Sequence, residues 1–388
     1  MRKINYLAQT NFRYFQNRFG IRQADRLFHT YIIGKTGTGK TTLLFNQIKQ
    51  DVQSGLGLSL IDPHGDLADK ILNVIPECRK EDLIVLDATD PNCPHGYNPL
   101  RRIAEDKRSL VASGIIETLK KLHDAKSWGV KMEHILRNVL LTLLDQPQAD
   151  FSCIPKILLD RYYRKECLRN ITNKAVRLFW QDEYDKYNPF QRANAITPIL
   201  NKIGAFLANP YLSNILISNR KQVSFRHSMD NKKIVIIKLT KGSIGEDASM
   251  LLGGLLINST SLAAFSRSDI SEDNRDPFYI YIDEFQSFAT LAIANMLSEL
   301  RKYKVGLILA NQFFSQLQPE IRDSVLGNVG TVISFRLGVS DAKYMEKEFF
   351  PIFKFGDIIS LPNYHLYLKL MIDGTPSKPF SAQTYWEE

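Results

Sequence analysis

A glycine-rich stretch has the residue types and spacing of a phosphate-binding loop: Gly34-Lys35-Thr36-Gly37-Thr38-Gly39-Lys40-Thr41. Its glycines let backbone N–H groups approach phosphates without a Cβ in the way, and the helix that continues through Thr42 adds its positive end. We expect Lys40 to reach the β- and γ-phosphates and the hydroxyl of Thr41 to ligate Mg²⁺. The sequence therefore predicts that residues 34–42 bind a nucleoside triphosphate, with ATP and Mg²⁺ as the ligands.

Two carboxylates, Asp283 and Glu284, directly follow the apolar run 278–282. Ligands of open parallel sheets bind at the carboxyl ends of the strands, which is where these side chains are expected. We predict that Asp283 holds Mg²⁺ and that Glu284 orients or deprotonates the attacking water. The alternative is a helix N-terminal cap, for which an Asp-Glu pair is also suited. The phosphate-binding loop in the same chain favours the catalytic role.

Gln312 ends a later apolar run, 307–310, after Asn311. Its amide is a candidate sensor that bonds the γ-phosphate or the attacking water and reports hydrolysis to the rest of the domain; the alternative is a simple Asn-Gln turn. The guanine-recognition pattern is absent, because Asn173-Lys174 and Asn201-Lys202 both lack the final aspartate. A GTPase switch is therefore not expected.

The elements that position these residues alternate between strand and helix. We predict strands at 28–33, 56–61, 83–86, 233–239, 278–282, 305–310 and 331–335, with a helix at 40–52. Such alternation is typical of a mostly parallel sheet covered on both faces. A late pair of strands, 364–372 and 378–382, is predicted as an edge hairpin around Asp373-Gly374-Thr375-Pro376.

Helical spacing replaces the strand pattern between residues 104 and 230, as in the run Ile115, Ile116, Leu119 and Leu122. We predict an α/β fold of the RecA-like P-loop NTPase type, with a mostly parallel sheet and an inserted all-helical domain. The predicted domains are a first nucleotide-binding part at 1–103, the helical insertion at 104–230, and a second nucleotide-binding part at 231–388, which carries the acidic strand and the sensor.

Composition adds weaker constraints. The 388 residues are 44% hydrophobic and carry a net charge of +9, which suggests an acidic partner such as nucleic acid. The four cysteines show no metal-binding spacing, so reduced thiols are expected. The apolar run 250–265 contains glycines, serines and an asparagine, and we expect a buried core helix there rather than a membrane span.

Further motifs resemble those of a known family. They are Asp62-Pro63-His64-Gly65-Asp66, Tyr97-Asn98-Pro99-Leu100, Lys241-Gly242-Ser243-Ile244-Gly245, and Arg301-Lys302-Tyr303 ahead of Leu309-Ala310-Asn311-Gln312. With the phosphate-binding loop and the Asp-Glu pair, they resemble the conjugative coupling ATPases of type IV secretion (the TraG/TraD type), within the FtsK and HerA superfamily of DNA-pumping motors. The resemblance runs from about residue 20 to about residue 340.

The resemblance implies a hexameric ring with ATP between subunits and a helical domain at one end of the channel. The family's trans-acting arginine falls on Arg301, and Arg336 is a second candidate; the alternative is that each is an ordinary surface residue. Fewer than 35 residues precede Gly34. We therefore expect a cytoplasmic chain, peripheral at the inner face of the membrane through docking on a membrane secretion complex.

The expected function is an ATP-hydrolysing ring motor that translocates DNA, single- or double-stranded, in conjugative transfer. The alternatives are an assembly or secretion ATPase acting on protein, and a nucleotide-gated scaffold. One stretch of the insertion interleaves cations with aromatic side chains, which suits DNA. The alternative, a solvated helix face whose aromatic side chains belong to the core, is slightly favoured for these residues. The residues of this stretch are Arg161, Tyr162, Tyr163, Arg164, Lys165, Arg169, Lys174, Arg177, Phe179 and Trp180.

Overall fold

The computed structural model describes residues 4–11, 16–101, 103–123, 128–217 and 220–385. Contacts between Cα atoms divide the chain into two compact units. The sheet unit comprises Met1–Val85, Ser224–Leu239 and Ala263–Glu388, and the helical unit comprises Leu86–Val223 and Thr240–Leu262. The domain boundaries expected at 103/104 and 230/231 stay a prediction, and the ends of those ranges, 1–3 and 386–388, lie outside the described residues.

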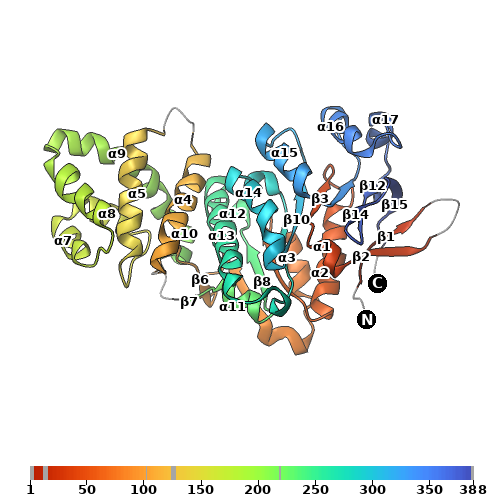
Figure 1. Cartoon of the computed structure of the whole chain (residues 1–388), viewed down its shortest axis with the longest axis horizontal. Coiled ribbons are helices and arrows are strands. Elements are labelled where there is room, and N and C mark those ends of the chain that lie inside the picture. Colours follow the sequence, from red (N-terminus) through yellow and green to blue (C-terminus); the bar gives the residue numbers. More distant parts are fainter. Residues whose placement is uncertain (1–3, 12–15, 102, 124–127, 218–219, 386–388) are drawn as a thin grey trace. The chain divides into compact units, whose positions relative to one another are not determined.

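Within the described residues, one sheet of eleven strands runs in the order β2-β1-β15-β12-β11-β3-β10-β9-β4-β8-β5. Figure 1 labels seven of its strands, namely β1, β2, β3, β8, β10, β12 and β15. Its strands are β1 (Ile4–Thr10), β2 (Arg18–Arg22), β3 (Thr30–Ile33), β4 (Gly57–Asp62), β5 (Leu83–Asp87), β8 (Ile234–Lys238), β9 (Phe278–Ile282), β10 (Val305–Asn311), β11 (Thr331–Ser334), β12 (His365–Lys369) and β15 (Phe380–Gln383). A separate small hairpin joins β13 (Met371–Ile372) and β14 (Thr375–Pro376).

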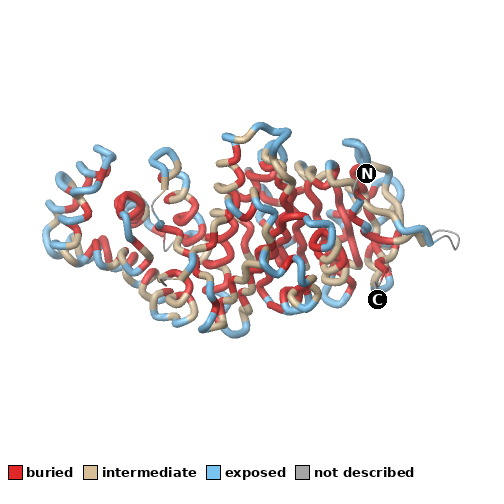
Figure 2. Tube along the Cα trace, turned by 90° about the horizontal axis from the view of Figure 1, so that it is seen from below, coloured by how far each residue is buried: buried red, intermediate tan, exposed pale blue. Residues whose placement is uncertain are grey.

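The central strands β11, β3, β10, β9, β4 and β8 pair in parallel. Every residue of β3, β4, β9, β10 and β11 is buried, as expected for strands that are covered on both faces. Figure 2 shows buried segments running through the interior, with exposed segments mainly at the outside. Their near-continuous aliphatic and aromatic sequences explain why these strands were predictable. The carboxyl ends of β3, β4, β9 and β10 consequently meet at one edge of the sheet.

The helices of the sheet unit follow or connect these strands. They are α1 (Gln23–Arg26), α2 (Lys40–Gln53), α3 (Asp66–Leu72), α11 (Phe225–Asp230), α14 (Leu291–Glu299), α15 (Pro319–Asn328), α16 (Val339–Phe349) and α17 (Phe355–Ile359). Helix α2 buries Leu43, Leu44 and Ile48 in the same hydrophobic cluster as side chains of β4 and β8. This packing fixes the start of α2 beside the end of β3.

The predicted edge hairpin is only partly correct. Strands β12 and β15 do pair antiparallel, but β1 pairs with β15 and β2 lies outside β1, so the edge belongs to an N-terminal hairpin. That hairpin was not predicted, because its inward face carries the polar Asn5 and obscures the apolar alternation. Asn5 is buried because its amide donates to a carboxylate oxygen of Asp51 at 2.9 Å and to the carbonyl of Gln47 at 3.0 Å.

In the described residues, the helical unit contains the seven α-helices from α4 to α10, followed by α12 (Lys241–Ile244) and most of α13 (Glu246–Ser266). The seven are α4 (Glu105–Lys121), α5 (Val130–Leu144), α6 (Cys153–Leu159), α7 (Arg161–Arg169), α8 (Lys174–Leu178), α9 (Pro189–Leu207) and α10 (Pro210–Leu216). Four of them begin after side-chain caps, Asp160, Asn173, Asn188 and Asn209. A two-residue parallel ladder joins β6 (His95–Gly96) to β7 (Lys221–Gln222).

One helical stretch in the described part of the chain, Glu246–Asp269, is long and apolar enough to cross a membrane by length and composition. Within its apolar window, 67% of the residues are buried inside the structure. That burial agrees with the predicted core helix.

Candidate nucleotide site

A cleft of about 330 Å³ lies in the sheet unit, where β3, β4, β9 and β10 end. Side chains and backbone from all four strand ends line it, together with one residue ahead of β12. The lining residues are Thr36, Gly37, Gly39, Lys40, Thr41, Thr42, Asp62, His64, Asp66, Leu67, Lys70, Asp283, Glu284, Gln312 and Tyr364. The cleft thus brings the phosphate-binding loop together with the predicted acidic pair and sensor amide.

The phosphate-binding loop needs glycine at two positions. Gly37 has φ 75° and Gly39 has φ 121°, and residues with a side chain rarely adopt these backbone conformations. At Gly39 a Cβ would also lie 3.0 Å from a ring carbon of Phe335. The buried Thr38 donates its hydroxyl to the carbonyl of Lys35 at 2.6 Å, which closes the turn from within. At these two glycines the loop therefore presents backbone rather than side chains to the cleft.

Lys40 is buried and spans the loop. Its ammonium donates to the carbonyl of Gly34 at 2.5 Å and to that of Lys35 at 3.2 Å. Burial lowers the pKa of Lys40, while the carboxylates of Glu284 and Asp283 act in the opposite direction. A partly desolvated ammonium at this place can exchange loop carbonyls for phosphate oxygens.

Asp283 is a buried carboxylate whose pKa is shifted by its surroundings. Burial, and then the nearby carboxylates of Glu284 and Asp62, raise the pKa of Asp283 to about 7. Asp62 is held by the backbone N–H groups of His64 and Ala68, each at 2.9 Å from one of its oxygens. Buried carboxylates near one another repel unless a cation lies among them.

This donor set fits Mg²⁺ and nucleotide phosphates. Oxygen ligands are available from Asp283 and Thr41, both of which line the cleft, and carboxylate and hydroxyl oxygens suit this hard cation. When bound, Mg²⁺ supplies positive charge that stabilises the phosphoryl group in transfer. The phosphates themselves match the exposed backbone at Gly37 and the ammonium of Lys40.

Glu284 and Gln312 meet directly. The amide of Gln312 donates to one carboxylate oxygen of Glu284 at 2.5 Å, and the amide of Gln286 donates to the other. The backbone of Glu284 has φ 47°, an uncommon conformation for a residue with a side chain. The ring Nε2 of His64 lies 4.0 Å from the carboxylate. A water beside Glu284 would therefore meet a proton acceptor and an amide that can orient it.

Three residues of the predicted loop do not line the cleft: Gly34, Lys35 and Thr38. Gly34 and Lys35 instead donate backbone N–H groups to the carbonyls of Asn311 at 3.2 Å and Arg336 at 3.0 Å. They hold the loop against the ends of β10 and β11.

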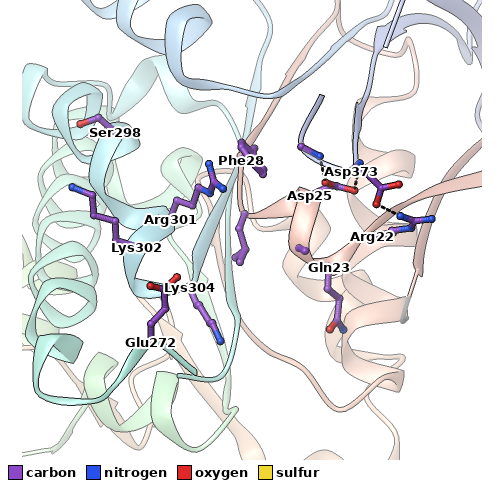
Figure 3. Close-up of a pocket in the computed structure, with 13 residues that line it drawn as sticks. Arg22, Gln23, Asp25, Phe28, Glu272, Ser298, Arg301, Lys302, Lys304 and Asp373 are labelled. Carbon is purple, nitrogen blue, oxygen red and sulfur yellow. Dashed lines mark hydrogen bonds and ion pairs between the residues drawn. The ribbon is translucent and has the colours of Figure 1, made fainter. Parts of the chain in front are cut away.

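Neither of the two predicted arginines lines this cleft. Arg301 belongs to a 3₁₀ turn, Leu300–Tyr303, ahead of β10, and lines a different cleft of about 980 Å³ with Phe28 and Asp373 (Figure 3). Because β10 begins just after that turn and ends at Asn311, next to Gln312, Arg301 and the nucleotide cleft lie at opposite ends of the strand. The guanidinium of Arg336 donates to the carbonyl of Leu361 at 3.2 Å and to the side chain of Asn363 at 2.7 Å. The trans role of either arginine stays a prediction.

Five polar residues of the cleft had no role assigned from the sequence: Asp62, His64, Asp66, Lys70 and Tyr364. The first three belong to the Asp-Pro-His-Gly-Asp motif, and their place directly after a buried strand was a usable signal. Tyr364 had no local signal. The N–H of Tyr364 donates to the carbonyl of Thr38 at 2.8 Å, a contact between segments far apart in the sequence.

The basic and aromatic stretch 161–180 of the helical unit contains both buried and exposed side chains. Phe179 and Trp180 are buried, and Trp180 donates to the hydroxyl of Thr142 at 2.8 Å. Arg164 is buried too, where it donates to the carbonyl of Ile157 at 2.9 Å and pairs with Asp185 at 3.5 Å. These members therefore support the core interpretation. The exposed members are Arg161, Tyr162, Lys165, Arg169, Lys174 and Arg177.

Comparison with known proteins places the chain in a family. A family model described as the type IV secretion-system coupling protein DNA-binding domain matches residues 20–349. The type 4 coupling protein DotL of Legionella pneumophila (strain Philadelphia 1) is 19% identical over 373 residues, which cover 81% of this chain and 48% of DotL. The chain thus spans about half the length of this curated relative.

Solved structures show the same fold. The plasmid coupling protein TrwB in complex with ADP and Mg²⁺ has a TM-score of 0.70 at 17% identity, covering 94% of this chain and 87% of that one. VirB4 of Thermoanaerobacter pseudethanolicus has a TM-score of 0.64 at 13% identity, covering 98% and 96%. The predicted P-loop NTPase fold with a large, mostly parallel sheet is confirmed. The chain therefore belongs to the type IV secretion-system coupling protein DNA-binding domain family, as its motifs predicted.

Proposed function

We propose that this chain is the ATP-hydrolysing motor of a type IV coupling protein, which assembles into a ring and translocates DNA. The observation that carries the proposal is the cleft in which Lys40 of the phosphate-binding loop, Asp283, Glu284 and Gln312 converge. Membership of a coupling-protein DNA-binding family supports DNA as the substrate. TrwB, which has the same fold, has been solved with ADP and Mg²⁺, which supports ATP and Mg²⁺ as the ligands here.

In this proposal the cleft residues that were predicted from the sequence have the following tasks. The loop backbone and Lys40 hold the β- and γ-phosphates, and Asp283 and Thr41 hold the Mg²⁺. Glu284 accepts a proton from the attacking water, which Gln312 helps to orient. Glu284 has its carboxylate inside the cleft, and this argues against a scaffold that binds ATP without hydrolysing it.

The place of Arg301 supports the proposed ring. Arg301 lies at the other end of β10 from its own cleft, so in this proposal the phosphoryl group that it serves belongs to a neighbouring subunit. A trans arginine stabilises the charge of the transferring phosphoryl group and makes each site depend on its neighbour. Arg336 is the second candidate for this role. The ring is expected to be hexameric, cytoplasmic and docked on a membrane secretion complex, with residues 104–230 as a helical domain at one end of its channel.

Displacement of a third strand from a DNA triplex tests translocation directly. We expect wild-type protein to displace the strand when ATP is present. We expect no displacement by Glu284→Gln with ATP, and none by wild-type protein with a non-hydrolysable ATP analogue. The rate should fall steeply with salt, because phosphate contacts release counterions. ATP turnover without displacement from either single- or double-stranded tracks would contradict the proposal and favour the protein-handling alternative.

A further inference from the structure

Arg301 differs from the other cations of the larger cleft at the amino ends of the strands (Figure 3). Each of the others has an oxygen partner: Arg22 has Asp373, Lys302 has Glu299 at 2.9 Å, and Lys304 has the carbonyl of Asp273 at 3.4 Å. The guanidinium of Arg301 has neither a hydrogen bond nor an ion pair to any residue in the described ranges. Its donors are therefore available to an external anion.

An aromatic ring holds this guanidinium in place. The Cζ atom of Arg301 lies 3.5 Å from the centroid of the Phe28 ring. The backbone of Phe28 is itself fixed, because its N–H donates to the carbonyl of Asp25 at 3.1 Å and its carbonyl accepts the N–H of Gly330 at 2.6 Å. Phe28 comes just before β3, the strand that leads into the phosphate-binding loop.

Stacking on a ring occupies the flat face of a guanidinium and leaves its N–H donors free in the plane. Those in-plane donors are the groups that bind phosphate oxygens in pairs. An unrestrained arginine must lose rotamer freedom when it engages a ligand, and a stacked arginine has lost much of it beforehand. A ring at this place therefore prepares Arg301 for an anionic ligand without competing for its donors.

We propose that Phe28 is a positioning residue for Arg301: it holds the guanidinium ready for the phosphoryl group bound to a neighbouring subunit. This inference rests on the proposed trans role of Arg301. Phe28 acts only through that arginine, so its loss should slow turnover without weakening the binding of ATP to a single subunit.

The test uses Phe28→Met, which keeps an apolar side chain of similar length, with Phe28→Tyr as the matched variant that keeps the ring. We expect Phe28→Met to lower kcat by about three- to thirtyfold, the range that one cation–π contact spans. The KM for ATP should not change, and Phe28→Tyr should retain wild-type kcat. The affinity of the assembled protein for ADP–aluminium fluoride, which mimics the transferring phosphoryl group, should fall by a similar factor. Phe28→Leu provides a second ringless variant if Phe28→Met does not fold.

The Arg301→Ala background separates the possible failures. There Phe28→Met should cause no further loss of affinity for ADP–aluminium fluoride, because the group that Phe28 positions is gone. If Phe28→Met lowers the affinity for ADP–aluminium fluoride equally in the wild-type and Arg301→Ala backgrounds, Phe28 acts through folding and the inference is overturned. The inference is also overturned if Phe28→Met has wild-type kcat while Arg301→Ala is inactive. Normal turnover of Arg301→Ala itself would instead contradict the proposed trans role.

Discussion

Lys40 is the residue on which nucleotide turnover should depend most. Its ammonium sits beneath the loop with only carbonyl partners, 2.5 Å and 3.2 Å away, and is therefore placed for phosphate oxygens. We predict that Lys40→Ala abolishes phosphate release, since no other ammonium of the loop lines the cleft. Lys80→Ala, which removes an exposed lysine that does not line the cleft, is the control and should keep wild-type turnover. Comparable losses in the two variants, measured by steady-state phosphate release, would contradict this assignment.

Individual residues of the site were predictable where the signal was local. The phosphate-binding loop carries its geometry in its own glycines. Asp283 and Glu284 were found because a fully buried strand ends beside them. The direct bond from Gln312 to Glu284 follows from the parallel pairing of β9 and β10, which aligns their ends. Tyr364 could not be found, because only the antiparallel strands bring it to the loop.

Among the contacts that join elements, the buried ion pair between Arg26 and Asp51 links α1 to α2. Two guanidinium donors of Arg26 meet the carboxylate at 2.6 Å and 2.7 Å, and the hydroxyl of Tyr281 on β9 donates to it at 2.6 Å. We predict that Asp51→Ala lowers the free energy of unfolding by about 3–5 kcal/mol, because it leaves a buried cation without its partner. Urea unfolding followed by circular dichroism measures this loss.

Glu77 supplies the control for that prediction, because its ion pair with Lys80 is exposed. Glu77→Ala should change the free energy of unfolding by less than about 1 kcal/mol. A loss below about 1 kcal/mol in Asp51→Ala as well would show that the buried pair contributes no more than a surface pair.

His29 links the end of α14 to β10 and should make folding depend on pH. Its Nδ1 accepts the N–H of Leu307 at 3.0 Å and its Nε2 lies 2.8 Å from the carbonyl of Leu297, which fixes a neutral ring. Burial lowers the pKa of His29 to about 4, against 6.5 for an exposed histidine. As pH falls, His29 is therefore protonated in the unfolded chain before it is protonated in the folded protein. The free energy of unfolding consequently decreases between pH 6.5 and pH 4, by about 3 kcal/mol in all.

His29→Asn removes this titration and tolerates the φ of 64° at this position. Its free energy of unfolding at pH 7 should be lower than that of the wild type, but should decline less between pH 7 and pH 5. Urea unfolding at both pH values compares the two slopes. Parallel declines in variant and wild type would mean that His29 is not the group responsible.

The elements themselves were predictable to differing degrees. Strands such as β9 and β10 are apolar throughout and buried on both faces, so composition alone located them. The hairpin of β1 and β2 was missed because its inward polar residue, Asn5, has a partner only in the folded protein. Sequence periodicity reports burial and does not report such tertiary hydrogen bonds.

For the whole molecule, the separation of Arg301 from its own cleft predicts sites shared between subunits. Lys40→Ala and Arg301→Ala should each be inactive alone, since every site then lacks one component. In a ring of head-to-tail interfaces, a 1:1 mixture should restore about a quarter of the wild-type ATPase activity, because some sites combine an intact Lys40 with a neighbour's intact Arg301. An inactive mixture, with assembly of mixed rings verified, would contradict the trans assignment.

The most direct test of a DNA-driven ring motor is steady-state ATPase activity, measured with and without single- and double-stranded DNA over a range of protein concentration. We predict strong stimulation by DNA that rises cooperatively with protein concentration, because subunits must assemble before sites are complete. Turnover that is indifferent to DNA and proportional to protein would contradict the motor. It would instead indicate an ATPase of the same fold that acts on protein.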